Sequence, residues 1–135
     1  MKKIKILLII VIAIVGAFLI YKKFEHINAN QKEIDKFVSE YTLITENHVF
    51  EIVNTAEVVN ILNNKTGIVF FCNPGSDWCQ HYAKILDDIA LENDINKIYY
   101  VDIKNDRNIN SNNYRKIVTI LQDFLDSDDT GNKRL

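Results

Sequence analysis

The sequence predicts an α/β domain with parallel strands, preceded by one N-terminal helix that spans a membrane. Between residues 48 and 125, three strand-like runs alternate with three segments of helical periodicity. Such alternation implies parallel strands joined by right-handed crossovers. A run of 16 uncharged, mostly aliphatic residues, 6–21, stands between lysines near the N-terminus. We therefore expect an anchor at 1–23, a stalk at 24–47 and a domain at 48–135.

The apolar run favours an uncleaved membrane anchor. As a helix it covers about 24 Å, and snorkelling by the flanking Lys5 and Lys22 makes up most of the difference to a hydrocarbon core of about 30 Å. A cleaved secretory signal is the competing interpretation, but Gly16-Ala17 lies inside the apolar run and no small-x-small site follows it. A buried helix of a soluble domain is a third interpretation. Three lysines precede the run and two follow it, which favours an extracytoplasmic location for the rest of the chain.

The charge balance excludes several function classes. After residue 23 the chain carries 11 basic and 18 acidic side chains. Nucleic-acid binding requires a basic face, so we expect no nucleic-acid partner. The sequence has no glycine-rich phosphate loop, which argues against nucleotide binding. Its two cysteines and three scattered histidines form no metal-ligand pattern, so we expect no metal and no other cofactor.

Each element of the domain has its own local signal. The short run at 49–53 alternates apolar and polar residues, and the run at 68–72 is continuously apolar, as in a strand buried on both faces. Thr55 is a suitable N-cap for the first helix, and the later helices carry apolar stripes. The strands are expected at 49–53, 68–72 and 98–103. The helices are expected at 55–63, 76–92 and 112–125, and the residues after 125 look loose.

The most informative stretch runs from Gly67 to His81. It consists of an apolar strand, a tight Asn73-Pro74-Gly75 turn, and Trp78-Cys79 at the start of an amphipathic helix. This arrangement resembles the active-site turn of the thioredoxin superfamily. More narrowly, it resembles the small bacterial thioredoxin-like proteins called bacteriocin transport accessory proteins. The resemblance covers residues 48–135 and implies a three-layer thioredoxin-like domain with redox ancestry.

The sequence departs from that family at the attacking residue, because Ser76 stands where the first cysteine belongs. In such a site the first cysteine attacks the substrate disulfide as a thiolate stabilised by the helix N-terminus. The second cysteine, here Cys79, then resolves the mixed disulfide. A serine hydroxyl cannot take the first step, because its pKa lies far above that of a thiol. Cys79, Ser76 and Trp78 are thus the candidate site of an enzyme with weak or no thiol–disulfide oxidoreductase activity.

Structural interpretations of the same residues stay open. Ser76 suits a plain N-cap, Cys79 a half-buried inert thiol, and His81 the helix surface. Trp78 could be a lid on the turn or a core contact. Cys72 ends the apolar strand on the face turned toward the Cys79 helix. A Cys72–Cys79 disulfide therefore requires only that their Cα atoms come within about 4.4–6.8 Å.

The family fold also continues with a β-hairpin, entered through a cis-proline, and a last helix. The one proline of this chain is Pro74, so the expected thioredoxin-like domain is incomplete. Its strand at 68–72 keeps an unpaired edge, open to strand addition by a partner. Either a truncated gene product or a covering partner explains this. The predicted function is a membrane-anchored, extracytoplasmic thioredoxin-like protein with a degenerate site. The alternatives are a non-catalytic module that binds a protein or peptide, as an accessory to a membrane peptide exporter, and an inactive gene fragment.

Overall fold

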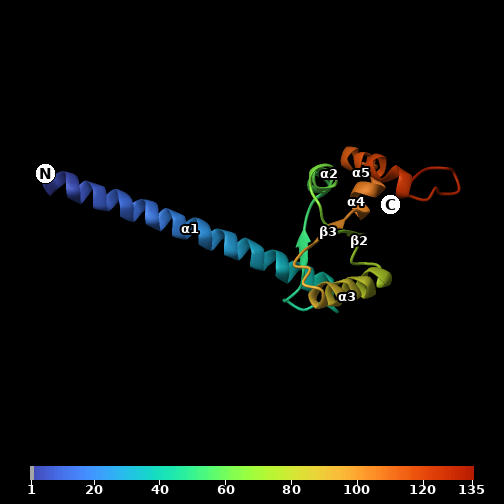
Figure 1. Ribbon diagram of the computed structural model, residues 1–135, viewed down its shortest axis with the longest axis horizontal. Coiled ribbons are helices and arrows are strands. Elements are labelled where there is room, and N and C mark those ends of the chain that lie inside the picture. The colour runs from blue at the N-terminus through green and yellow to red at the C-terminus, as the bar shows by residue number, and fades with distance from the viewer. Residues whose placement is uncertain (1) are drawn as a thin grey trace. The chain divides into compact units, whose positions relative to one another are not determined.

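A computed structural model describes residues 2–135, with side chains from residue 10 onward. The chain divides into two compact units, the first ending at residue 36 and the second comprising residues 37–135. Helix α1 (Lys2–Glu40) makes up the first unit and contributes its last residues to the second (Figure 1).

The predicted membrane anchor is wrong. Nowhere in the described part of the chain is a helix both long enough and apolar enough to cross a membrane. The uncharged run covers only about 24 Å of helix, against a hydrocarbon core of about 30 Å. Helix α1 then continues without interruption through Lys22, Lys23 and further charged residues to Glu40. The side chains of residues 1–9, where the predicted anchor begins, lie outside the described set. The predicted single-pass membrane location with an extracytoplasmic domain depended on this anchor and is therefore wrong as well.

The predicted fold class, a thioredoxin-like three-layer domain behind a transmembrane helix, is also wrong. The second unit is a small α/β domain built on a three-stranded sheet of order β1-β3-β2. Strands β1 (Phe50–Ile52) and β2 (Val69–Cys72) both pair in parallel with β3 (Ile98–Asp102). Alternating strands and helices favour parallel pairing, but they specify neither the complete sheet of a particular family nor a membrane span. The predicted thioredoxin-like sheet and membrane span therefore required more than this pattern of elements could support.

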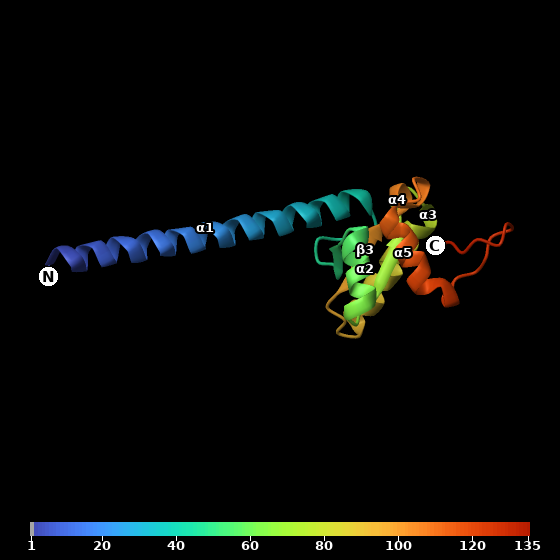
Figure 2. The ribbon, with the colours of Figure 1, turned by 90° about the horizontal axis from the view of Figure 1, so that it is seen from above.

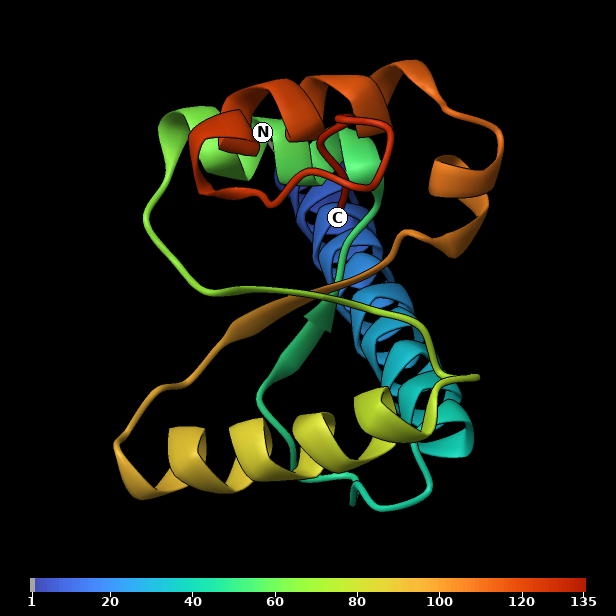
Figure 3. The same cartoon turned by 90° about the vertical axis from the view of Figure 1, so that its right-hand side faces the viewer.

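Four helices belong wholly to the second unit. They are α2 (Thr55–Asn64), α3 (Asp77–Glu92), α4 (Lys104–Asn108) and α5 (Asn112–Leu121). Helix α3 lies on one side of the sheet, and α2 and α5 lie together on the other (Figure 3). The expected helix at 112–125 ends early as α5 and passes into a 3-10 turn at Gln122–Phe124. The chain after it forms a loop that projects from the helices (Figure 2).

The two faces of the sheet bury separate apolar clusters. Alternation along β2 directs Phe70 and Cys72 to the α3 side, where they pack against buried Tyr100 and Ala83. Val69 and Phe71 face the other side, where they join a cluster with α2 and α5. Strand β2 is therefore enclosed on both faces, in keeping with its unbroken apolar sequence.

The end of α1 contributes to the α3-side cluster. Phe37, Tyr41 and Ile44 are buried there, although the sequence assigned them to a stalk. The Phe37 ring lies 4.6 Å from the Tyr41 ring and 4.8 Å from the Phe50 ring, centre to centre. Burial raises the pKa of Tyr41 to about 12, because the phenolate would lose its hydration. The buried Phe37 therefore marks the first residue of the globular unit.

Helix α2 begins with a capping box centred on Asn54 rather than on the expected Thr55. The Asn54 side chain accepts from the N–H groups of Ala56 and Glu57, both at 3.0 Å. The Glu57 carboxylate in turn accepts from the Asn54 N–H at 2.8 Å. Thr55 instead donates its hydroxyl to Asp106 at 3.1 Å, which ties α2 to α4.

Candidate functional site

The segment between β2 and α3 is a tight turn that brings the end of the strand close to the start of the helix. The Ser76 N–H donates to the Asn73 carbonyl at 3.2 Å, which closes the turn over Pro74 and Gly75. Ser76 is the N-cap of α3 by position, but its side chain makes no capping hydrogen bond. The capping role expected of its hydroxyl is therefore not performed.

Cys72 and Cys79 form a disulfide across this turn. Their Cα atoms lie 5.8 Å apart, within the range that such a bond requires. Cys72 is the last residue of β2 and is half-buried. Cys79 lies in the first turn of α3 on the side facing the sheet, and only 6% of its surface is exposed. The bond thus joins an edge strand to a helix N-terminus.

The surroundings of Cys79 favour negative charge on its sulfur. The Asn73 N–H donates to Cys79 Sγ at 3.4 Å. The first turn of α3 adds main-chain N–H groups and the positive end of the helix dipole. Both effects lower the energy of a thiolate relative to a thiol. When a thiolate attacks the disulfide, Cys79 is therefore a better leaving group than Cys72, because Cys72 does not lie at a helix N-terminus.

The structure places the other predicted site residues around the turn. Trp78 is neither a lid nor a core contact, because 74% of its surface is exposed. Its ring lies 6.2 Å from that of Tyr82, one helical turn further along. His81 lies exposed on α3, as its helical position indicates. Of the predicted set, only Cys72 and Cys79 are directly joined.

Gln80 is a site residue that the sequence reasoning missed. Its Nε2 donates to the carbonyls of Pro74 and Glu40, both at 2.8 Å. Its Oε1 accepts from the Thr42 N–H at 3.2 Å. One amide therefore fixes the turn, the start of α3 and the end of α1 together. The signal that the sequence offers is an amide side chain directly after Cys79, 6 residues after Pro74.

Asp87 anchors the second half of α3 in a similar way. Its buried carboxylate accepts from the Val49 N–H at 3.0 Å, just before β1. The neighbouring His48 accepts from the Phe50 N–H through Nδ1 at 3.1 Å. Burial lowers the pKa of His48, and the nearby Asp87 charge opposes part of that shift. Gln80 and Asp87 thus attach one side of α3 to the segment that leads into β1.

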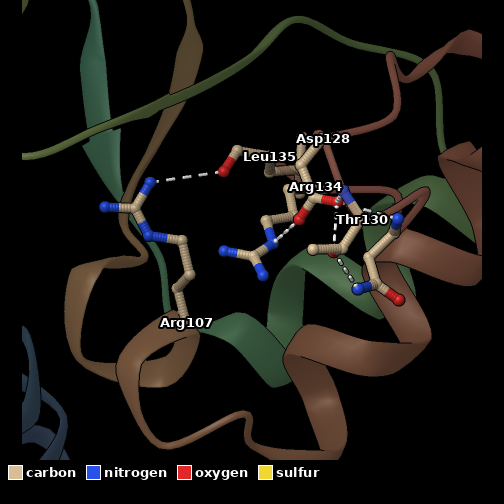
Figure 4. Close-up of polar contacts among 6 residues, drawn as sticks. Arg107, Asp128, Thr130, Arg134 and Leu135 are labelled. Atoms are coloured by element: carbon tan, nitrogen blue, oxygen red, sulfur yellow. Dashed lines mark hydrogen bonds and ion pairs between the residues drawn. The ribbon is translucent and has the colours of Figure 1, made fainter.

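A cavity of about 740 Å³ lies elsewhere, between α5 and the C-terminal loop. The residues that line it are Arg107, Asn108, Asn110, Tyr114, Arg115, Val118, Thr119, Asn132, Lys133 and Arg134. Its cations already have partners within the chain. Arg107 donates to the Leu135 carbonyl at 3.3 Å, and Arg134 pairs with Asp128 at 2.6 Å (Figure 4). The first contact ties the C-terminal residue to α4 and the second lies within the loop, so the basic lining of the cavity does not require a ligand.

No metal site stands out in residues 10–135, where no three or more His, Cys, Asp or Glu side chains are grouped to hold an ion. No protein-family model, curated protein or solved structure matches the chain. The geometry around Cys72 and Cys79 is therefore the basis for any functional proposal.

Proposed function

We propose that this protein exchanges disulfides slowly with dithiol substrates and that Cys72–Cys79 is its redox couple. The observation that carries the proposal is the disulfide between the end of β2 and the first turn of α3. A disulfide whose one sulfur lies at a helix N-terminus has a stabilised leaving thiolate, which favours exchange. The resemblance of the turn to a thioredoxin-type active site supports the same chemistry.

The attacked atom is Cys72 Sγ. Cys72 is half-buried at the end of an edge strand, whereas Cys79 is almost fully covered. A substrate thiolate attacks Cys72 Sγ, the S–S bond breaks, and Cys79 leaves as a thiolate. The Asn73 N–H and the start of α3 stabilise that thiolate. The product of this step is a mixed disulfide between the substrate and Cys72.

The second step requires a substrate with two thiols. Its second thiolate attacks the substrate sulfur of the mixed disulfide and releases Cys72 as a thiolate. The substrate has then been oxidised to a disulfide by two electrons, and the protein has become a dithiol. The couple is reversible, so the reduced protein can pass these electrons to a substrate disulfide. We expect slow rates, because Ser76 provides no attacking thiol at the exposed helix end.

The proposal can be tested by capture of glutathione on single-cysteine variants of the full-length chain. In Cys79→Ser, the free Cys72 thiol should react with oxidised glutathione to give a mixed disulfide and one reduced glutathione. In Cys72→Ser, the covered Cys79 should react at least about tenfold more slowly, because access limits exchange. Intact-mass spectrometry over time measures both rates. Faster capture by Cys72→Ser, or no capture by either folded variant, would contradict the proposal.

A further inference from the structure

One side of α3 carries an uncovered apolar stripe. Trp78, Tyr82, Ile85 and Ile89 follow the helical repeat along a single face, and each is at least half exposed. We call these four residues the α3 stripe. Large apolar side chains grouped in this way on a small domain are typical of an interaction site.

The position of the α3 stripe follows from the contacts of the other helix sides. Cys79, Ala83 and Ala90 are buried against the sheet. Gln80 and Asp87 bind the segment that leads into β1. At 3.6 residues per turn, the α3 stripe is on the side of the helix opposite Gln80 and Asp87. It therefore lies toward β2, at the far side of the sheet from β1.

Strand β2 is an edge of the sheet on that same side. The Tyr99 N–H donates to the Ile68 carbonyl at 2.9 Å, and the pairing continues in register as far as Cys72 and Asp102. In a parallel pair, alternate residues direct their main-chain groups to the same neighbour. The N–H and C=O groups of Val69 and Phe71 therefore point away from β3. An added strand can pair with such groups.

The charges beside the α3 stripe indicate the chemistry of the partner. Asp77 lies at one end of the α3 stripe and Glu92 at the other. Between them, the exposed Asp88 pairs with Lys84, so the balance of charge beside the α3 stripe is acidic. A second copy of the chain paired through β2 would bring two such acidic rims together. Basic residues on a different polypeptide would complement them.

We propose that the free edge of β2 and the α3 stripe form a docking site for an extended segment of another polypeptide. The segment adds to the sheet as a strand beside Val69 and Phe71. Its apolar side chains, at alternate positions, cover the α3 stripe, and Lys or Arg residues at its ends lie near Asp77 and Glu92. This inference goes beyond disulfide exchange, because the docked segment needs no cysteine.

The probe is the fluorescent peptide Lys-Lys-Val-Ser-Ile-Ser-Val-Lys-Lys, titrated with the full-length, oxidised chain and followed by anisotropy. The Ile85→Glu variant should bind the peptide at least about tenfold more weakly, because it places a charge in the apolar contact. The control is Phe124→Glu, which changes an apolar side chain that is even more exposed and lies outside this surface. The control should bind within about twofold of the wild type.

A second probe tests strand pairing without any change to the protein. The same peptide, N-methylated at alternate residues along one edge, keeps its side chains but loses the main-chain donors. It should bind at least about tenfold more weakly. Equal binding of the methylated peptide would overturn the proposal, as would equal effects of Ile85→Glu and Phe124→Glu. A dimer that Ile85→Glu dissociates, with no binding of the peptide, would assign the surface to a second copy and also overturn it.

Discussion

Replacing Phe37 by alanine should destabilise the globular unit strongly, although the sequence places this residue outside the domain. The Phe37 side chain is fully buried, and its ring lies 5.0 Å from that of Tyr100 in the central strand. It also stacks on Tyr41 and Phe50. Removing a buried phenylalanine side chain typically costs about 3–5 kcal/mol. We expect a loss in this range, a large part of the about 5–15 kcal/mol that stabilises a typical domain.

Urea unfolding of the full-length chain, with the disulfide intact, measures this loss. Near-ultraviolet circular dichroism of the tyrosines follows the globular unit without reporting on helix content. The matched control is Phe24→Ala, because Phe24 lies in the same helix and is exposed. Its free energy of unfolding should stay within about 0.5 kcal/mol of the wild type. If Phe37→Ala also stays within that limit, the end of α1 is not part of the core and our placement of the domain boundary is refuted.

Two further predictions concern the attachment of α3. Asp87→Ala should lower the free energy of unfolding by about 1–3 kcal/mol, because it leaves the buried Val49 N–H without its acceptor. Asp88→Ala, at the exposed neighbouring position, should change it by no more than about 0.5 kcal/mol in urea unfolding; equal effects would contradict this role for Asp87. Burial holds the pKa of His48 below its unfolded value of 6.5, so the unfolded chain takes up this proton more readily than the folded one. Stability should therefore fall as the pH falls from about 6.5 toward the lower folded pKa, and His48→Gln should flatten that dependence in urea unfolding at a series of pH values. An unchanged slope would exclude His48 as the cause.

The strands could be predicted from the sequence because each has a strong local pattern. The apolar run at 68–72 became β2, enclosed on both faces, and the alternation along it placed Cys72 on the α3 side. From the sequence, the Cys72–Cys79 disulfide was named but left open, since the bond depends on a Cα separation that the turn geometry sets. Sequence reasoning could place Cys72 on the face turned toward the helix of Cys79, but it could not give the distance between them.

The remaining errors have physical causes. The apolar residues Phe37 and Tyr41 stand in a polar stretch with weak periodicity, and their burial depends on β1 and β3, which come later in the chain. The N-cap of α2 was misplaced by one residue because Asn54 and Thr55 are both good capping types. The anchor was inferred from a run that is shorter than a membrane core. The prediction relied on snorkelling of the flanking lysines for the missing length, but the helix continues into charged residues as far as Glu40.

The disulfide and the docking surface meet at one residue. Cys72 is the last residue of β2, and β2 supplies the free edge. A segment that pairs with Val69 and Phe71 lies beside the end of β2 that carries Cys72, whereas Cys79 is covered. A thiol carried by such a segment would therefore reach Cys72 Sγ first, while Cys79 stays behind the turn with its sulfur held by the Asn73 N–H. The same sheet edge would thus select the substrate and determine which sulfur it attacks, and that sulfur would belong to the strand rather than to the helix.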